Sequence, residues 1–208
     1  GSEMCIRDSF FPELMEEYPS LDIRVTEMKT QECLEALKAG ELEALIAGAA
    51  EGAHFHSIPL YYESFLGYVS RHNALFKKEM IRSSEVSGEQ LWLLDEGHCF
   101  RDQLMRFCQL ESAQSCQIAY RLGSMETFMR MVESGKGITF IPELAVLQLN
   151  DEQKRLVRPF AMPRPTRRIY IVTRTDFIRH TLLNMLIEKI KACIPKEMLT
   201  LQNGQKVV

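Results

Sequence analysis

Apolar and polar residues alternate along the chain with two periods, one typical of helices and one typical of strands. The helical period predicts a helix from Pro12 to Glu17, a helix over 31–38 that Thr30 caps and Gly40 ends, and a long amphipathic helix over 179–192. Apolar runs predict strands at 21–25, 42–47, 57–61, 65–69, 91–94, 118–122, 138–141 and 169–172. This order of elements is typical of an α/β fold with largely parallel sheets.

One arrangement of residues occurs twice in the chain. Residues 30–48 and 124–142 each contain a hydroxyl residue that can cap a helix, an amphipathic helix, a glycine that ends it and a buried strand. Two βαβ sheets built alike predict a two-lobed, periplasmic-binding-protein-like effector domain, each lobe a mixed sheet flanked by helices, with ligand at helix N-termini between them. We expect 9–65 with 169–208 to form the first lobe and 66–168 the second. Residues 1–8 are interpreted as a tag-like remnant, and 199–208 as a segment that frays.

The composition narrows the function classes. The chain has 208 residues, of which 46% are hydrophobic, and a formal net charge of −3, so it is unsuited to be a nucleic-acid-binding surface. No apolar stretch is long enough to span a membrane and no signal-peptide pattern opens the sequence, which indicates a cytoplasmic location. The six cysteines lack the spacing of a disulfide scaffold or of a zinc site, and His54-x-His56 is more typical of a loop or strand than of metal ligands. We therefore expect no metal and no cofactor.

The segment 97–108, GHCFRDQLMRFC, carries the candidate chemistry. Cys99 lies between His98 and Arg101 near the start of a predicted helix, and both cations and a helix N-terminus favour the reactive thiolate. Nine helical residues would separate the Cα atoms of Cys99 and Cys108 by about 13 Å, whereas a disulfide needs about 4.4–6.8 Å. A disulfide between these cysteines would therefore require the helix to unwind. The alternative is that Cys108 packs as a small hydrophobe and that Cys99 is incidental.

Three segments together resemble a known family: 97–108, SMETFMRMVESGKGITFIPELAV at 124–146, and 10–46 from FFPELMEEY to LEALI. They are similar to the regulatory domains of OxyR-type regulators, the peroxide sensors among LysR-type transcription regulators, and the resemblance runs from about Phe10 to about residue 195. It implies two lobes joined by strands that cross near residues 66 and 168. It also implies that Cys99 reacts with peroxide to give sulfenic acid and that Cys108 is its disulfide partner. The positions that match the peroxide pocket of the family are Thr30, His98, Arg101, Asp102, Gln103 and Arg167.

The resemblance further implies a redox sensor, not an enzyme, that forms a homodimer or tetramer and has hydrogen peroxide as its ligand. The winged helix-turn-helix domain of the family is not in this sequence, so DNA would be bound only through that domain. RNA polymerase and a thioredoxin-type or glutaredoxin-type reductant are candidate partners, and a membrane is not.

Each candidate residue also has a structural interpretation. In this interpretation Thr30 is a helix cap, Arg101 and Asp102 form a solvated turn, and Arg167 covers a sheet edge. Two other functions therefore stay open. One is an effector domain that binds a small anion at the helix N-termini after Thr30 and Ser124. The other is a thiol peroxidase that turns over peroxide with an external reductant.

Overall fold

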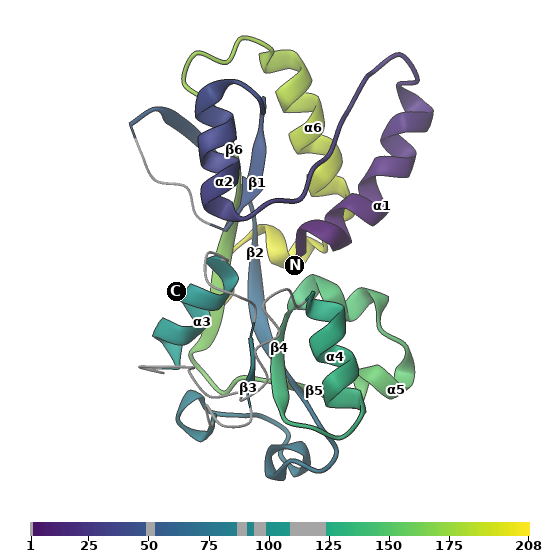
Figure 1. The fold of residues 1–208 in the computed structure, drawn as a ribbon, viewed down its shortest axis with the longest axis vertical. Coiled ribbons are helices and arrows are strands. Elements are labelled where there is room, and N and C mark those ends of the chain that lie inside the picture. Colours follow the sequence, from purple (N-terminus) through teal and green to yellow (C-terminus); the bar gives the residue numbers. More distant parts are fainter. Residues whose placement is uncertain (1, 49–52, 87–90, 94–98, 109–123) are drawn as a thin grey trace. The chain divides into compact units, whose positions relative to one another are not determined.

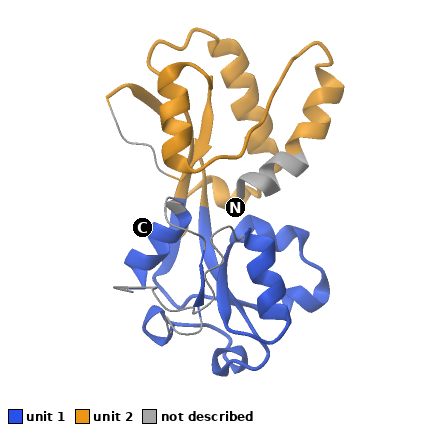
Figure 2. Ribbon diagram, viewed as in Figure 1, with its two compact units in different colours: residues 1, 63–167, 203–208 blue, residues 2–62, 168–202 orange. Residues whose placement is uncertain are grey.

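The computed structural model describes residues 2–48, 53–86, 91–93, 99–108 and 124–208, with the main chain only for 2–9 and Cys99 (Figure 1). The chain divides into two compact units, coloured separately in Figure 2. Unit 1 contains Glu63–Arg167 and Asn203–Val208, and unit 2 contains Ser2–Tyr62 and Arg168–Gln202. Two strands, β2 (Phe55–Val69) and β6 (Arg164–Arg174), each run from one unit into the other.

Unit 2 is built from helices around a short strand pair. Its elements are α1 (Ser2–Glu17), α2 (Thr30–Ala39), β1 (Leu45–Ala47), α6 (His180–Cys193) and the 3-10 turn η5 (Lys196–Leu199). β1 pairs antiparallel with β6, with Leu45 opposite Val172. One face of α2 buries Cys33 and Leu37 against Leu45 and Val172, which form one of the hydrophobic clusters of this unit.

Three predictions for this part of the chain are wrong. The first helix begins at Ser2, so Pro12 lies inside α1 and does not open it. Residues 21–25 form no strand, because their side chains are half-buried or exposed and no neighbouring strand pairs with them. Thr30 is the first helical residue of α2, and the N-cap position belongs to Lys29. Gly40 ends α2 as predicted, with a φ of 77° that favours glycine.

Unit 1 contains the longer sequence of elements. They are η1 (Ala74–Lys77), η2 (Ser83–Glu85), β3 (Leu91–Trp92), α3 (Cys99–Phe107), α4 (Met125–Glu133), β4 (Ile138–Pro142), η4 (Glu143–Gln148), α5 (Asp151–Lys154), β5 (Val157–Pro159) and β7 (Gln205–Val207). Ser124 caps α4 as predicted, since its Oγ accepts a hydrogen bond from the Thr127 N–H at 3.3 Å. The predicted strands at 57–61 and 65–69 are parts of the single strand β2. The predicted strand at 118–122 lies outside the described residues.

The prediction of largely parallel sheets is wrong. β2 pairs antiparallel with both β4 and β5, and β1 pairs antiparallel with β6. Among the described pairs, β3 with β4 and β6 with β7 are parallel. Helix-strand alternation gives parallel neighbours when successive strands lie side by side. Here β1 lies beside β6, which comes from the far end of the chain, and the strand order is β1-β6-β2-β4-β3.

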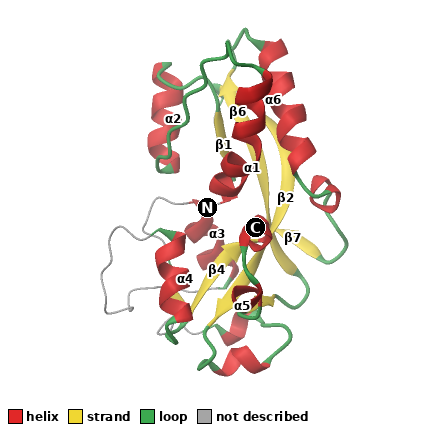
Figure 3. Cartoon of the chain, turned by 90° about the vertical axis from the view of Figure 1, so that its right-hand side faces the viewer, coloured by secondary structure: helices red, strands yellow, loops and turns green. Residues whose placement is uncertain are grey.

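The end of the chain is ordered, so the prediction that 199–208 frays is also wrong. β7 pairs with β6 in the register Arg164↔Gln205 to Thr166↔Val207 (Figure 3). Residues Asn203–Val208 consequently belong to unit 1, whereas the sequence places them in the first lobe with 169–202. The hydropathy pattern could not reveal this strand, because its burial is low and main-chain pairing with β6 holds it. Within the described part of the chain, no helix combines the length and apolar character needed to cross a membrane.

Candidate functional site

The helix α3 connects the two candidate redox cysteines. It begins at Cys99, and its hydrogen-bond pattern continues to Cys108, whose N–H donates to the Leu104 carbonyl at 2.9 Å. The helix predicted between the cysteines is therefore confirmed. At the helical rise, the two Cα atoms lie about 13 Å apart, which is too far for a disulfide without unwinding.

One face of α3 holds this helix in the core of unit 1. Phe100, Leu104 and Cys108 recur every fourth residue on this face and are all buried. They pack in a cluster with Phe65, Val69, Leu75, Ile81, Val86, Leu91, Ile138, Phe140 and Phe160. Unwinding α3 would withdraw all three side chains from this cluster, so the reduced arrangement is stabilised by apolar burial.

Cys99 occupies the N-terminal end of α3. The first N–H groups of a helix have no partners within the helix and carry partial positive charge, which favours a thiolate at this position. His98 lies outside the described residues.

Cys108 has the opposite environment. Its side chain is 7% exposed, and burial among apolar groups raises the pKa of the thiol to about 12. It is consequently a neutral thiol at physiological pH and a poor primary target for peroxide. It can react only after it leaves the core.

The polar residues of α3 differ in burial. Arg101 is half-buried, and Asp102 is exposed with its carbonyl accepting a hydrogen bond from Arg106 Nε at 3.2 Å. Gln103 is 5% exposed, and its Nε2 donates to the main-chain oxygen of Val208 at 3.2 Å. The Oε1 atom of Gln103 is buried and has no hydrogen-bond partner among the described residues.

Arg167 is buried beside the first turn of α3. Its exposure is 1%, and its guanidinium carbon lies 5.0 Å from the centroid of the Phe100 ring. Nε and Nη2 of Arg167 contact Oε2 of Glu63 at 3.0 and 2.9 Å. Oε1 of Glu63 accepts the Leu144 N–H at 3.3 Å. Arg167 is therefore not a cover for a sheet edge, which was its structural interpretation.

The sequence analysis missed Glu63. It is the one charged residue between His56 and Arg71, in a run of otherwise apolar and uncharged polar residues. A carboxylate in such a run, buried to 0% exposure, requires a cationic partner. This signal could have identified Glu63 as the partner of a buried arginine, although the sequence could not say which one.

The predicted site residues fall into two groups. Cys99, Arg101, Asp102 and Gln103 lie on α3 and Cys108 directly follows it, while Arg167 lies against that helix in unit 1. Thr30 lies in unit 2, where it is half-buried at the start of α2.

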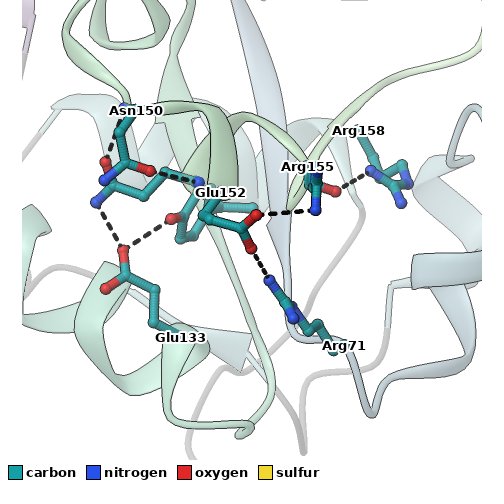
Figure 4. Close-up of polar contacts among 8 residues, drawn as sticks. Arg71, Glu133, Asn150, Glu152, Arg155 and Arg158 are labelled. Atoms are coloured by element: carbon teal, nitrogen blue, oxygen red, sulfur yellow. Dashed lines mark hydrogen bonds and ion pairs between the residues drawn. The ribbon is translucent and has the colours of Figure 1, made fainter.

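A second polar cluster in unit 1 connects α4, α5 and β2 (Figure 4). The carboxylate of Glu133 accepts hydrogen bonds from the Tyr68 hydroxyl at 2.8 Å and from Gln153 Nε2 at 2.9 Å. Burial, with Glu133 as a further cause, raises the pKa of Tyr68. Glu152 binds Arg71 at 2.5 Å and Arg155 at 2.8 Å. The hydrogen bonds of Glu133 therefore link α4 to α5 and to the sheet, whereas the ion pairs of Glu152 are exposed and contribute little.

The described residues contain no group of three or more potential metal ligands.

Comparisons with known proteins agree with the resemblance seen in the sequence. The family model for the LysR substrate binding domain matches residues 9–192. Among solved structures, reduced OxyR from Porphyromonas gingivalis is 48% identical with a TM-score of 0.90, and the match covers 100% of this chain and 96% of the other. A second structure of OxyR from the same organism is 50% identical with a TM-score of 0.90, covering 98% and 93%.

A curated relative is the hydrogen peroxide-inducible genes activator of Haemophilus influenzae, which is 30% identical over 94% of this chain. This chain spans 64% of the length of that relative. The relative is named as a gene activator and not as an enzyme. The family match covers most of the chain, and its α/β architecture is that of the neighbouring structures. The chain therefore belongs to the LysR substrate-binding domain family, within which it is similar to OxyR regulatory domains.

Proposed function

We propose that this chain is the regulatory domain of a hydrogen-peroxide-sensing LysR-type transcription regulator, with Cys99 as the reacting cysteine and Cys108 as its disulfide partner. The observation that carries it is α3 itself. The helix begins at Cys99, where a thiolate is favoured, and is followed directly by Cys108, whose thiol is buried and whose pKa is raised. The names of the relatives, which refer to hydrogen peroxide, support the same ligand.

The chemistry has two steps. The Cys99 thiolate attacks one oxygen of hydrogen peroxide, so that an S–O bond forms, the O–O bond breaks and hydroxide leaves to be protonated to water. Cys108 then attacks the sulfenic sulfur. The S–S bond forms, the S–O bond breaks, and a second water leaves with the proton of the Cys108 thiol. The second step needs the unwinding of α3, and that change of fold is the signal.

The residues that match the family's peroxide pocket have the chemistry that this scheme needs. Arg167 and Arg101 are cations that favour a thiolate, a protonated imidazole at His98 would do the same, and Thr30, Asp102 and Gln103 carry groups that can orient peroxide and protonate the departing oxygen. The proposed lobes are 9–65 with 169–202 and 66–168 with 203–208, since β7 belongs to unit 1. A homodimer or tetramer would pass the change in α3 to an attached DNA-binding domain in the cytoplasm.

Mass spectrometry after limited peroxide tests this function. We expect a disulfide between Cys99 and Cys108, loss of rapid peroxide consumption in Cys99→Ser, and a trapped sulfenic acid in Cys108→Ser. Cys193→Ser is the matched control, because Cys193 is a free thiol of unit 2, and it should behave as wild type. A disulfide to Cys116 or Cys193 would show that the assignment is wrong. Sustained turnover of peroxide with thioredoxin would instead identify a peroxidase. Binding of a small anion that survives Cys99→Ser would identify an anion-binding effector domain.

A further inference from the structure

We infer that β7 is a positioning element for the redox helix, and that its main-chain contact to Gln103 restrains α3 in the helical, reduced state. This inference rests on the proposed function and adds a control on its second step. It assigns to residues 203–208 the task of slowing the release of Cys108 from the core.

The first observation is how β7 is held. Val208 donates its N–H to the Thr166 carbonyl at 3.0 Å, and Arg164 donates its N–H to the Gly204 carbonyl at 2.7 Å. Gln205 adds a side-chain hydrogen bond to Ser64 Oγ at 2.9 Å. These bonds fix the strand on β6 directly before the buried Arg167.

The second observation is what β7 holds in turn. The Val208 main-chain oxygen accepts the hydrogen bond from Gln103 Nε2, and the Val208 side chain packs against the apolar cluster that contains Phe100, Leu104 and Cys108. Figure 1 places this end of the chain beside α3. Gln103 lies between Cys99 and Cys108 in sequence, so this bond attaches the end of β7 to the part of the helix that must unwind.

The third observation is the energetic position of Gln103. Its side chain is only 5% exposed, and its Oε1 has no hydrogen-bond partner among the described residues. The bond to Val208 is thus the one hydrogen bond that the structure describes for this amide. When a buried amide already lacks one hydrogen-bond partner, losing the other leaves it with no hydrogen bond and makes its burial unfavourable in free energy. While β7 is docked, Gln103 is fixed; once β7 leaves, burial of Gln103 becomes unfavourable and α3 opens more often.

The substitution Val208→Pro tests this. Proline removes the N–H that bonds to Thr166 and leaves Val207 in its extended conformation. The matched control is Val208→Ile, which keeps the N–H and the apolar contact. In the reduced full chain, we expect hydrogen exchange of the α3 amides to be about 2- to 12-fold faster in Val208→Pro than in Val208→Ile, the factor for one net hydrogen bond.

A substitution at a glycine elsewhere in unit 1 separates this effect from general destabilisation. Gly135, like Gly204, has a positive φ in unit 1, but a Cβ at Gly135 would meet His72 and not the contacts of β7. Gly135→Val should weaken unit 1 without accelerating exchange in α3 relative to β4. In Gln103→Leu, the effect of Val208→Pro should shrink to the part that comes from the apolar contact of Val208, because the hydrogen bond to the amide is already gone.

The kinetic readout links β7 to the sensor. In Val208→Pro, we expect the Cys99 sulfenic acid, once formed, to convert to the disulfide about 2- to 12-fold faster than in Val208→Ile, with this step measured apart from the formation of the sulfenic acid. Equal α3 exchange in Val208→Pro and Val208→Ile would refute the restraint. If wild type formed no Cys99–Cys108 disulfide, the proposed function would fail, whereas the hydrogen-exchange comparison would still decide whether β7 restrains α3.

Discussion

Arg167 and Glu63 form a buried ion pair, and both residues belong to unit 1. Charges in such a place are retained only when paired, because each one alone would have to be removed from water without compensation. Arg167 also lies over the rings of Phe65 and Phe100, which contact each other edge to face at 5.0 Å. Glu63 therefore positions the cation that lies next to the first turn of α3.

Removal of Glu63 should be costly. Glu63→Gln leaves the guanidinium buried without its carboxylate, and we expect the free energy of unfolding to fall by about 3–5 kcal/mol. Urea denaturation of the reduced protein measures this. The control is Asp22→Asn, which breaks the exposed pair with Arg24 and should leave the midpoint unchanged. A loss in Glu63→Gln no larger than in the control would show that the pair does not hold Arg167.

The pH dependence at Cys108 has a definite sign. Burial raises the pKa of this thiol from 9.0 to about 12, so the unfolded state releases the proton first. The contribution of the protonated Cys108 thiol to the free energy of unfolding is fully present below pH 9 and is lost as the pH rises toward 12. We expect the difference in unfolding free energy between wild type and Cys108→Ala to shrink over this range in denaturant titrations. A difference that stays constant from pH 8 to pH 11 would contradict the burial of a protonated thiol.

At the scale of elements, the sequence predicts best where a local signal and burial coincide. Helix α4 has a capping serine, an amphipathic face and a following glycine, and the repeat with α2 makes it visible without any knowledge of tertiary structure. α3 was predicted from a run of helix-forming residues with an apolar face, which is also a local signal. β7 was missed, and the strand at 21–25 was wrongly predicted, because pairing partners far along the chain decide whether a short extended segment becomes a strand.

The partners of the site residues are hidden for a similar reason. Gln103 and Val208 are separated by 105 positions, and Glu63 and Arg167 by 104. Periodicity identifies the helix on which Gln103 lies, but it cannot show which main-chain oxygen the amide reaches. The two cysteines could be identified from the sequence, because the helix between them is a local feature and the family motif includes both residues.

At the scale of the whole molecule, β2 and β6 are continuous through both units, so neither unit can unfold completely without breaking strands that also belong to the other. The only tryptophan of the sequence is Trp92, which is buried in unit 1 and donates its Nε1–H to the Lys136 carbonyl at 3.0 Å. Its fluorescence reports unit 1 alone, whereas circular dichroism reports the helices of both units.

A core substitution in unit 2 should therefore change the fluorescence transition of unit 1. Leu37 is 0% exposed, and Leu37→Ala should cost about 2–5 kcal/mol. We expect the urea midpoints of Trp92 fluorescence and of circular dichroism to fall together. Lys38→Ala, at the neighbouring exposed position of α2, should move neither signal. An unchanged fluorescence midpoint beside an earlier dichroism transition would show that the continuous strands do not couple the units.

The burial of Cys108 has a consequence for recovery after oxidative stress. If its sulfur moves to Cys99, the cluster around Phe65 and Leu104 loses a member, and the vacated volume costs packing energy in the oxidised protein. That cost is subtracted from the stability of the S–S bond and raises its reduction potential above that of an unstrained surface disulfide. Cellular thiols would then return the protein to its resting form more readily, so the burial of Cys108, which slows formation of the disulfide, would also shorten the lifetime of the oxidised state.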